Sequence, residues 1–62
     1  MTPTTAKRAV AEMTSHIRER LSGIPGVTDT AVQNLVFGWL RQEQPQVLEV
    51  LSADEVCKVI AA

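Results

Sequence analysis

The segment from Val32 to Leu40, VQNLVFGWL, has apolar residues on more than one side of a helix. At about 100° per residue, one apolar stripe forms along it. Its members are Val32, Leu35, Val36, Trp39 and Leu40. Phe37 falls roughly 140° from Val32, among polar neighbours. A helix with apolar residues on two sides must be covered on two sides, so the segment predicts contact with a partner surface.

The chain of 62 residues predicts a single domain, residues 1–62. A domain of this size buries only about 60% of the surface of its unfolded chain, and small domains usually need a disulfide, a metal or a partner. Cys57 is the only cysteine, which excludes an intrachain disulfide. His16 and Cys57 cannot complete a zinc site without two more ligands. We therefore expect self-association, as a homodimer, to supply the missing stabilisation.

Charge and hydropathy limit the partners and the cellular compartment that we expect for the chain. The formal net charge of −1 gives no general attraction to nucleic acid or to anionic membranes. No window approaches the roughly 20 unbroken apolar residues that span a bilayer. The N-terminal segment lacks the apolar stretch of an export signal, and a single cysteine fits a reducing compartment. These features predict a cytoplasmic protein with no membrane partner.

Two longer helices are predicted first. The first has a seam of apolar residues at spacings of three and four, after a frayed segment over residues 1–4 and a cap at Thr4 or Thr5. The seam consists of Ala6, Val10, Met13, Ile17 and Leu21. Gly23, Pro25 and Gly26 should end this helix.

The second helix should begin at Thr28 as N-cap, or at Thr30 as the alternative, and continue to Gln42 or Glu43. Gly38 inside it costs about 1 kcal/mol relative to alanine. Such a glycine suggests that another backbone approaches closely at this point.

Two short helices follow in the C-terminal third. Pro45 suits the first position of a helix over residues 46–51. Ser52 and Glu55 have the spacing of a capping box, which predicts a fourth helix over residues 53–60. Nothing alternates with period two over a useful length, so the predicted fold is all-α: a small bundle of two longer helices plus two short C-terminal helices.

The residues with reactive side chains do not form a catalytic set. His16 lies beside an apolar seam without a second proton-transfer group, and Cys57 has Asp54 nearby, which disfavours a thiolate. Asp54 and Glu55 are explained by their place in the first turn of a helix. We therefore expect no catalytic residue, cofactor, metal or small-molecule substrate, and a protein that is not an enzyme.

The stretch from Gly26 to Asn34 resembles the turn and recognition helix of repressor-type helix-turn-helix proteins. The resemblance implies a small DNA-binding regulator as an alternative function. The side chains facing the major groove would then be Thr28, Thr30, Gln33 and Asn34, of which Gln and Asn suit adenine.

The function that the sequence favours is a non-enzymatic interaction or regulatory module that acts through an apolar helical surface. Aromatic residues and arginine are the usual anchors of protein interfaces. The expected partner-binding residues are Val36, Phe37, Trp39, Leu40 and Arg41. Phe37 is expected to serve association, with burial under the third or fourth helix of the same chain as the alternative, and Trp39 is expected to serve folding. Binding of nucleic acid is not expected.

Overall fold

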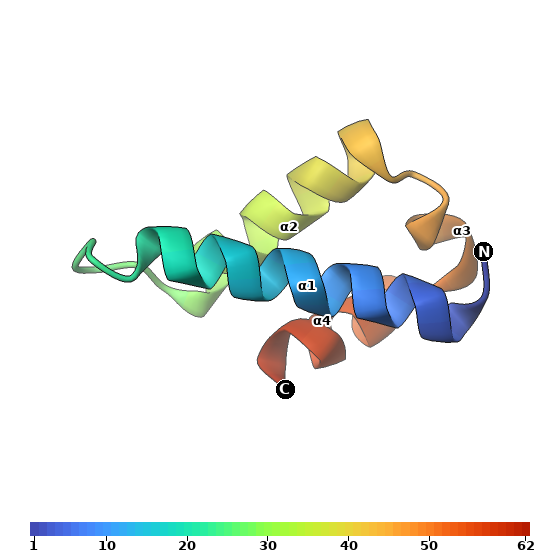
Figure 1. The fold of residues 1–62 in the computed structure, drawn as a ribbon, viewed down its shortest axis with the longest axis horizontal. Coiled ribbons are helices and arrows are strands. Elements are labelled where there is room, and N and C mark those ends of the chain that lie inside the picture. The colour runs from blue at the N-terminus through green and yellow to red at the C-terminus, as the bar shows by residue number, and fades with distance from the viewer.

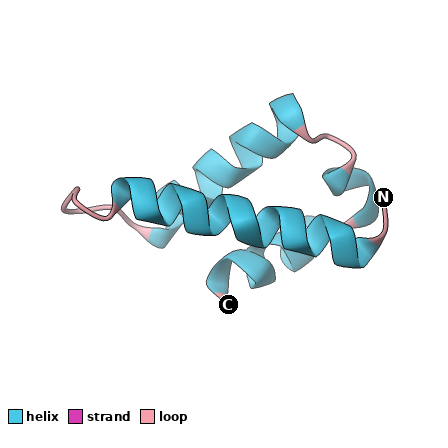
Figure 2. Ribbon diagram, viewed as in Figure 1, coloured by secondary structure: helices cyan, strands magenta, loops and turns pink.

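The computed structural model describes residues 1–62 and contains four helices and no strand (Figures 1 and 2). The first two helices are the longer ones, which confirms the predicted all-α bundle. Their bounds are α1 Pro3–Leu21, α2 Asp29–Glu43, α3 Val47–Val50 and α4 Ala53–Ala61.

Helix α1 forms the long axis of the bundle and contacts each of the other three helices. The C-terminal end of α2 points away from α1 (Figure 1). The chain then returns through α3, which lies near the N-terminus. Helix α4 then packs against α1 on a different side from α2. Because both α2 and α4 contact α1, its apolar seam is covered from two directions.

The core is a single cluster of nine buried apolar residues drawn from all four helices and the turn before α4. They are Ala6, Val10, Val32, Val36, Leu40, Val47, Leu51, Val56 and Ile60. Thr14 is the one buried polar residue. Its hydroxyl donates to the Val10 carbonyl oxygen at 2.7 Å, so burial leaves no polar group of Thr14 unpaired.

The start of α1 corrects a prediction. The helix begins at Pro3 and is capped by Thr2, whose hydroxyl oxygen accepts from the Thr5 amide at 3.2 Å. The predicted cap at Thr4 or Thr5 is therefore wrong, and Pro3 and Thr4, which were expected to fray, are helical. Proline suits the first helical position because the amide it lacks would have no partner inside the helix.

The connection from α1 to α2 contains the one left-handed residue of the chain, Gly26, with φ of 82°. Only glycine adopts this conformation readily. Thr28 caps α2, accepting from the Ala31 amide at 3.1 Å, which confirms the first of the two predicted starts and excludes Thr30 as the cap. The predicted end of α2 at Glu43 is also correct.

The C-terminal elements differ from prediction mainly in length. Helix α3 spans four residues because Pro45 and Gln46 form a turn before it and Leu51 is extended after it. The capping box is confirmed: Glu55 donates its amide to the Ser52 hydroxyl, and its carboxylate accepts from the Ser52 amide, both at 3.2 Å. Helix α4 continues one residue past the predicted end, to Ala61.

Candidate interaction surface

Two of the five expected partner-binding residues lie in the core. Val36 and Leu40 are 0% exposed and form one row with Val32 along α2. Residues four apart share one face of a helix, and this row faces the other three helices. The side chains of Val36 and Leu40 therefore do not reach the surface, which revises the expectation that they contact a partner.

Phe37 and Trp39 have similar environments, in contrast to the separate roles expected for them. Both are half-buried, and both pack against the core cluster. Helical periodicity puts them on opposite flanks of the buried row, Trp39 about 60° from Val36 on one side and Phe37 about 100° on the other. Each side chain therefore supports the core and also presents part of its surface outside.

Leu35 is the apolar residue of α2 whose position the sequence did not reveal. Periodicity predicts that Leu35 lies on the core stripe, but the residue is 50% exposed. Gly38 lies three residues further on the same side of α2, and a Cβ at Gly38 would meet nothing within 4 Å. The expected close approach of another backbone to Gly38 is therefore absent within the chain. Gly38 therefore has no steric need within the chain to be glycine, and half of the Leu35 side chain is left uncovered.

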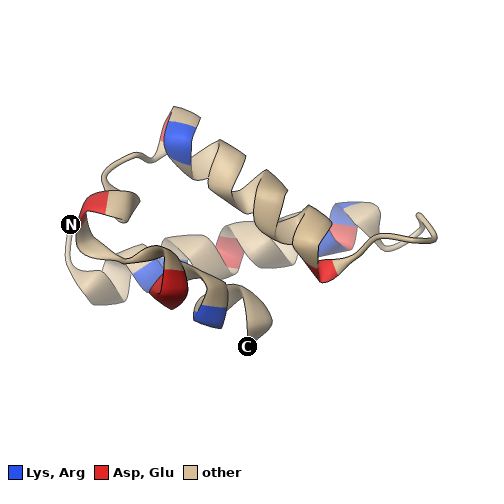
Figure 3. Cartoon of the chain, turned by 180° about the vertical axis from the view of Figure 1, so that it is seen from behind, with Lys and Arg blue, Asp and Glu red and all other residues tan.

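We define the outer face of α2 by Ala31, Leu35, Gly38 and Trp39, which helical periodicity puts on one side of the helix. None of the eleven residues from Thr30 to Leu40 is charged. Figure 3 shows this middle part of α2 without charge, whereas charges mark both ends of the helix. The outer face is therefore an uncharged strip with one exposed leucine at its centre.

The outer face continues onto α1 through a hollow of about 300 Å³ beside Trp39. Helix α1 contributes most of its lining. The lining residues are Ala9, Glu12, Met13, His16, Trp39 and Gln44. Apolar side chains thus form part of the hollow, while Glu12 and His16 contribute polar groups to its wall.

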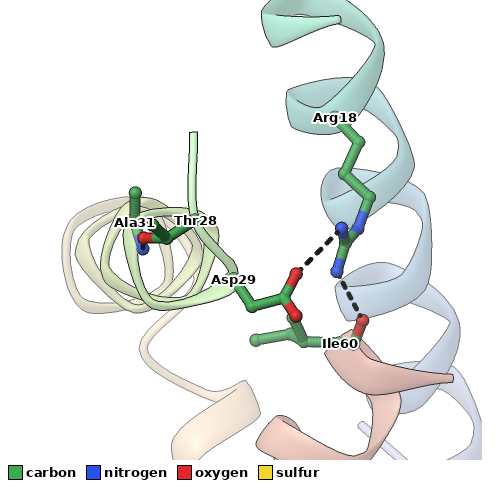
Figure 4. A network of polar contacts seen from close by, with 5 residues as sticks. All are labelled: Arg18, Thr28, Asp29, Ala31 and Ile60. Atoms are coloured by element: carbon green, nitrogen blue, oxygen red, sulfur yellow. Dashed lines mark hydrogen bonds and ion pairs between the residues drawn. The ribbon is translucent and has the colours of Figure 1, made fainter. Parts of the chain in front are cut away.

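The N-terminal end of α2 is joined to α1 by a polar network around Arg18 (Figure 4). One guanidinium nitrogen of Arg18 lies 3.4 Å from the Asp29 carboxylate, and the other donates to the Ile60 carbonyl oxygen at 3.1 Å. Both terminal nitrogens of the Arg18 guanidinium are therefore engaged within the chain.

Only some of the residues that the helix-turn-helix resemblance assigns to DNA contact are exposed. Thr30 and Asn34 are exposed on α2, Gln33 is half-buried, and the Thr28 hydroxyl is engaged as the helix cap. Across the turn, Arg18 is paired with Asp29. The structure thus brings Thr30 and Asn34 to the surface, while Arg18, one of the two arginines in the last turn of α1, is already engaged by Asp29.

The other candidate reactive groups are dispersed. His16 is exposed on α1, and Cys57 is half-buried on α4. No three His, Cys, Asp or Glu side chains come together in a way that could hold a metal ion. The hydrogen bond from the Ser52 amide, assisted by the Ser52 hydroxyl, lowers the pKa of Glu55 below its usual range.

Comparison with protein-family models, with curated proteins and with solved structures gave no match. None of the four helices combines the length and the apolar composition that crossing a bilayer requires.

Proposed function

We propose that this chain is a non-enzymatic interaction module that associates with a second copy of itself through the outer face of α2. The observation that carries the proposal is Leu35, which is 50% exposed in the middle of an uncharged strip. A contiguous exposed apolar patch is typical of a contact surface, and Leu35 lies between Ala31 and Trp39 on one uncharged side of α2. Trp39 beside it supplies the aromatic group that interfaces favour.

Small size supports the same proposal. Only nine apolar residues are buried, and neither a disulfide nor a metal cluster reinforces them. Covering Leu35 and the exposed part of Trp39 would add apolar burial at about 25 cal/mol per Å². Part of that gain is offset by the entropy lost on association. Self-association is therefore a physically reasonable source of stability for this fold.

Replacing Leu35 by glutamate tests the proposal. Leu35→Glu should leave the helical circular dichroism unchanged, because the side chain lies outside the core. It should also abolish association in size-exclusion chromatography with light scattering. Ala53→Glu is the matched control, since it adds the same charge to the exposed first turn of α4, where the helix dipole tolerates it.

If Leu35→Glu associates as strongly as the native chain, the outer face of α2 is not the contact surface. Binding of duplex DNA that is lost with Gln33→Ala plus Asn34→Ala would instead favour the helix-turn-helix alternative.

A further inference from the structure

We propose that the two copies pair through a two-fold axis that sets α1 antiparallel to α1 and α2 antiparallel to α2, with Glu12 of each copy facing Arg20 of the other. This inference rests on the proposed function and specifies its geometry. It is drawn from a row of three exposed polar side chains on α1, two of which line the hollow beside Trp39 of α2.

The row consists of Glu12, His16 and Arg20, at intervals of four residues on one side of α1. All three are exposed. The one ion pair in the chain joins Arg18 and Asp29, so Glu12 and Arg20 have no ionic partner of their own. The row carries a negative charge at one end and a positive charge at the other, equally far from His16.

A two-fold axis beside His16 makes this row complementary to itself. In an isologous interface, residue i contacts residue j and residue j contacts residue i. Reversal of α1 about His16 therefore brings Glu12 opposite the second copy's Arg20, and Arg20 opposite the second copy's Glu12. A parallel arrangement would set like charges against each other instead, at a cost in stability.

The outer face of α2 has the same symmetry. An antiparallel pairing centred between Val36 and Phe37 places Leu35 of each copy opposite Gly38 of the other. Leu35 projects outward, and the space above Gly38 is open. The leucine of one copy can thus occupy the space left by the glycine of the other, and no charge is buried because the strip has none.

The row on α1 and the outer face of α2 belong to one continuous surface. Glu12 and His16 of α1 line the same hollow as Trp39 of α2, so a single partner can cover both helices. A standard interface buries about 800 Å² per partner, roughly a fifth of the chain's 4204 Å². The molecule extends 35 × 22 × 16 Å, so its broad side is large enough for such a contact.

Charge reversal tests this pairing directly. Glu12→Arg alone sets the introduced guanidinium against Arg20 in both contacts, and Arg20→Glu alone sets the introduced carboxylate against Glu12. Each variant should raise the dissociation constant of the dimer about tenfold, the scale expected for two exposed ion pairs. An equimolar mixture of the two variants should recover the native affinity, because every contact in the mixed dimer then joins opposite charges.

Sedimentation equilibrium of each variant and of the mixture measures these constants, and circular dichroism establishes that each variant is folded. Glu49→Arg and Lys58→Glu, on the exposed parts of α3 and α4, are matched controls that should change neither association nor its response to mixing. If the native chain dimerises but the mixture fails to recover affinity, the pairing is overturned and the proposed function stands. A monomeric native chain would overturn both.

Discussion

Arg18 and Ile60 are 42 positions apart in the chain, yet a guanidinium nitrogen of Arg18 donates to the Ile60 carbonyl oxygen at 3.1 Å (Figure 4). The second guanidinium nitrogen approaches Asp29 at 3.4 Å. One side chain of α1 therefore joins the end of α4 to the start of α2. The contact also satisfies one of the last four carbonyl groups of α4, which have no partner inside that helix.

Replacing Arg18 by alanine should lower the free energy of unfolding by about 1 kcal/mol, because the charged hydrogen bond to Ile60 is partly exposed to water. Asp29→Asn should cost clearly less, since the Asp29 side chain is 83% exposed. Chemical denaturation monitored by circular dichroism measures both values. An equal loss in the two variants would show that the ion pair, and not the bond to Ile60, is the stabilising contact.

Titration of Glu55 should reveal the capping box. Because the folded pKa of Glu55 is lowered, mainly by the Ser52 amide, its contribution to stability is present above the unfolded pKa. That contribution is lost as the pH falls through the folded pKa. Glu55→Gln should therefore be less stable than the native chain at neutral pH, and the difference should vanish in acid.

Two-dimensional NMR of the Glu55 carboxyl group measures the pKa itself. Ser52→Ala should raise this pKa only in part, because alanine keeps the backbone amide that is the larger cause of the shift and removes only the hydroxyl. The same variant should lower stability by about 1 kcal/mol, the ordinary cost of losing an N-cap. A normal pKa in the native chain would mean that the reciprocal contacts of the box do not form in solution.

Leu40 and Leu35 differ in burial although they lie on the same helix. Leu40→Ala should cost about 2–5 kcal/mol, because the side chain is fully buried and a cavity remains. Since a core of this size contributes only about 3–5 kcal/mol, this variant should be largely unfolded. Leu35→Ala should change stability by about 0.5 kcal/mol or less at concentrations where the chain is monomeric. Comparable losses in thermal unfolding would place Leu35 in the core.

The features that the sequence predicts correctly depend on residues close together in the chain. Thr28 and Ser52 are recognisable as caps because the groups they bind lie three residues away. The sequence does not single out Pro3 as the helix start, because the two threonines after it are competing cap candidates. The exposure of Leu35 could not be read from periodicity, since Leu35 and Trp39 flank the buried row on one side and Phe37 flanks it on the other. Which of these flanks is covered depends on where α1, α3 and α4 pack.

Substitution of Gly38 should have opposite effects on the stability of the monomer and on association. Gly38→Ala should raise the stability of the monomer by about 0.5–1 kcal/mol, because the added Cβ meets nothing in the chain and the unfolded state loses freedom. The same methyl group should weaken association by occupying the space proposed for the second copy's Leu35. Thermal unfolding at low micromolar concentration and sedimentation of the same variant measure the two effects. Association that is unchanged or stronger would remove Gly38 from the contact.

Sedimentation equilibrium of the native chain, from about ten micromolar to about one millimolar, tests the central claim most directly. One chain has a mass of 6.8 kDa. Self-association through the outer face of α2 predicts a weight-average mass that rises with concentration toward twice that value, and no further, because a two-fold interface closes on itself. A mass that stays at that of the single chain up to millimolar concentration would contradict the account.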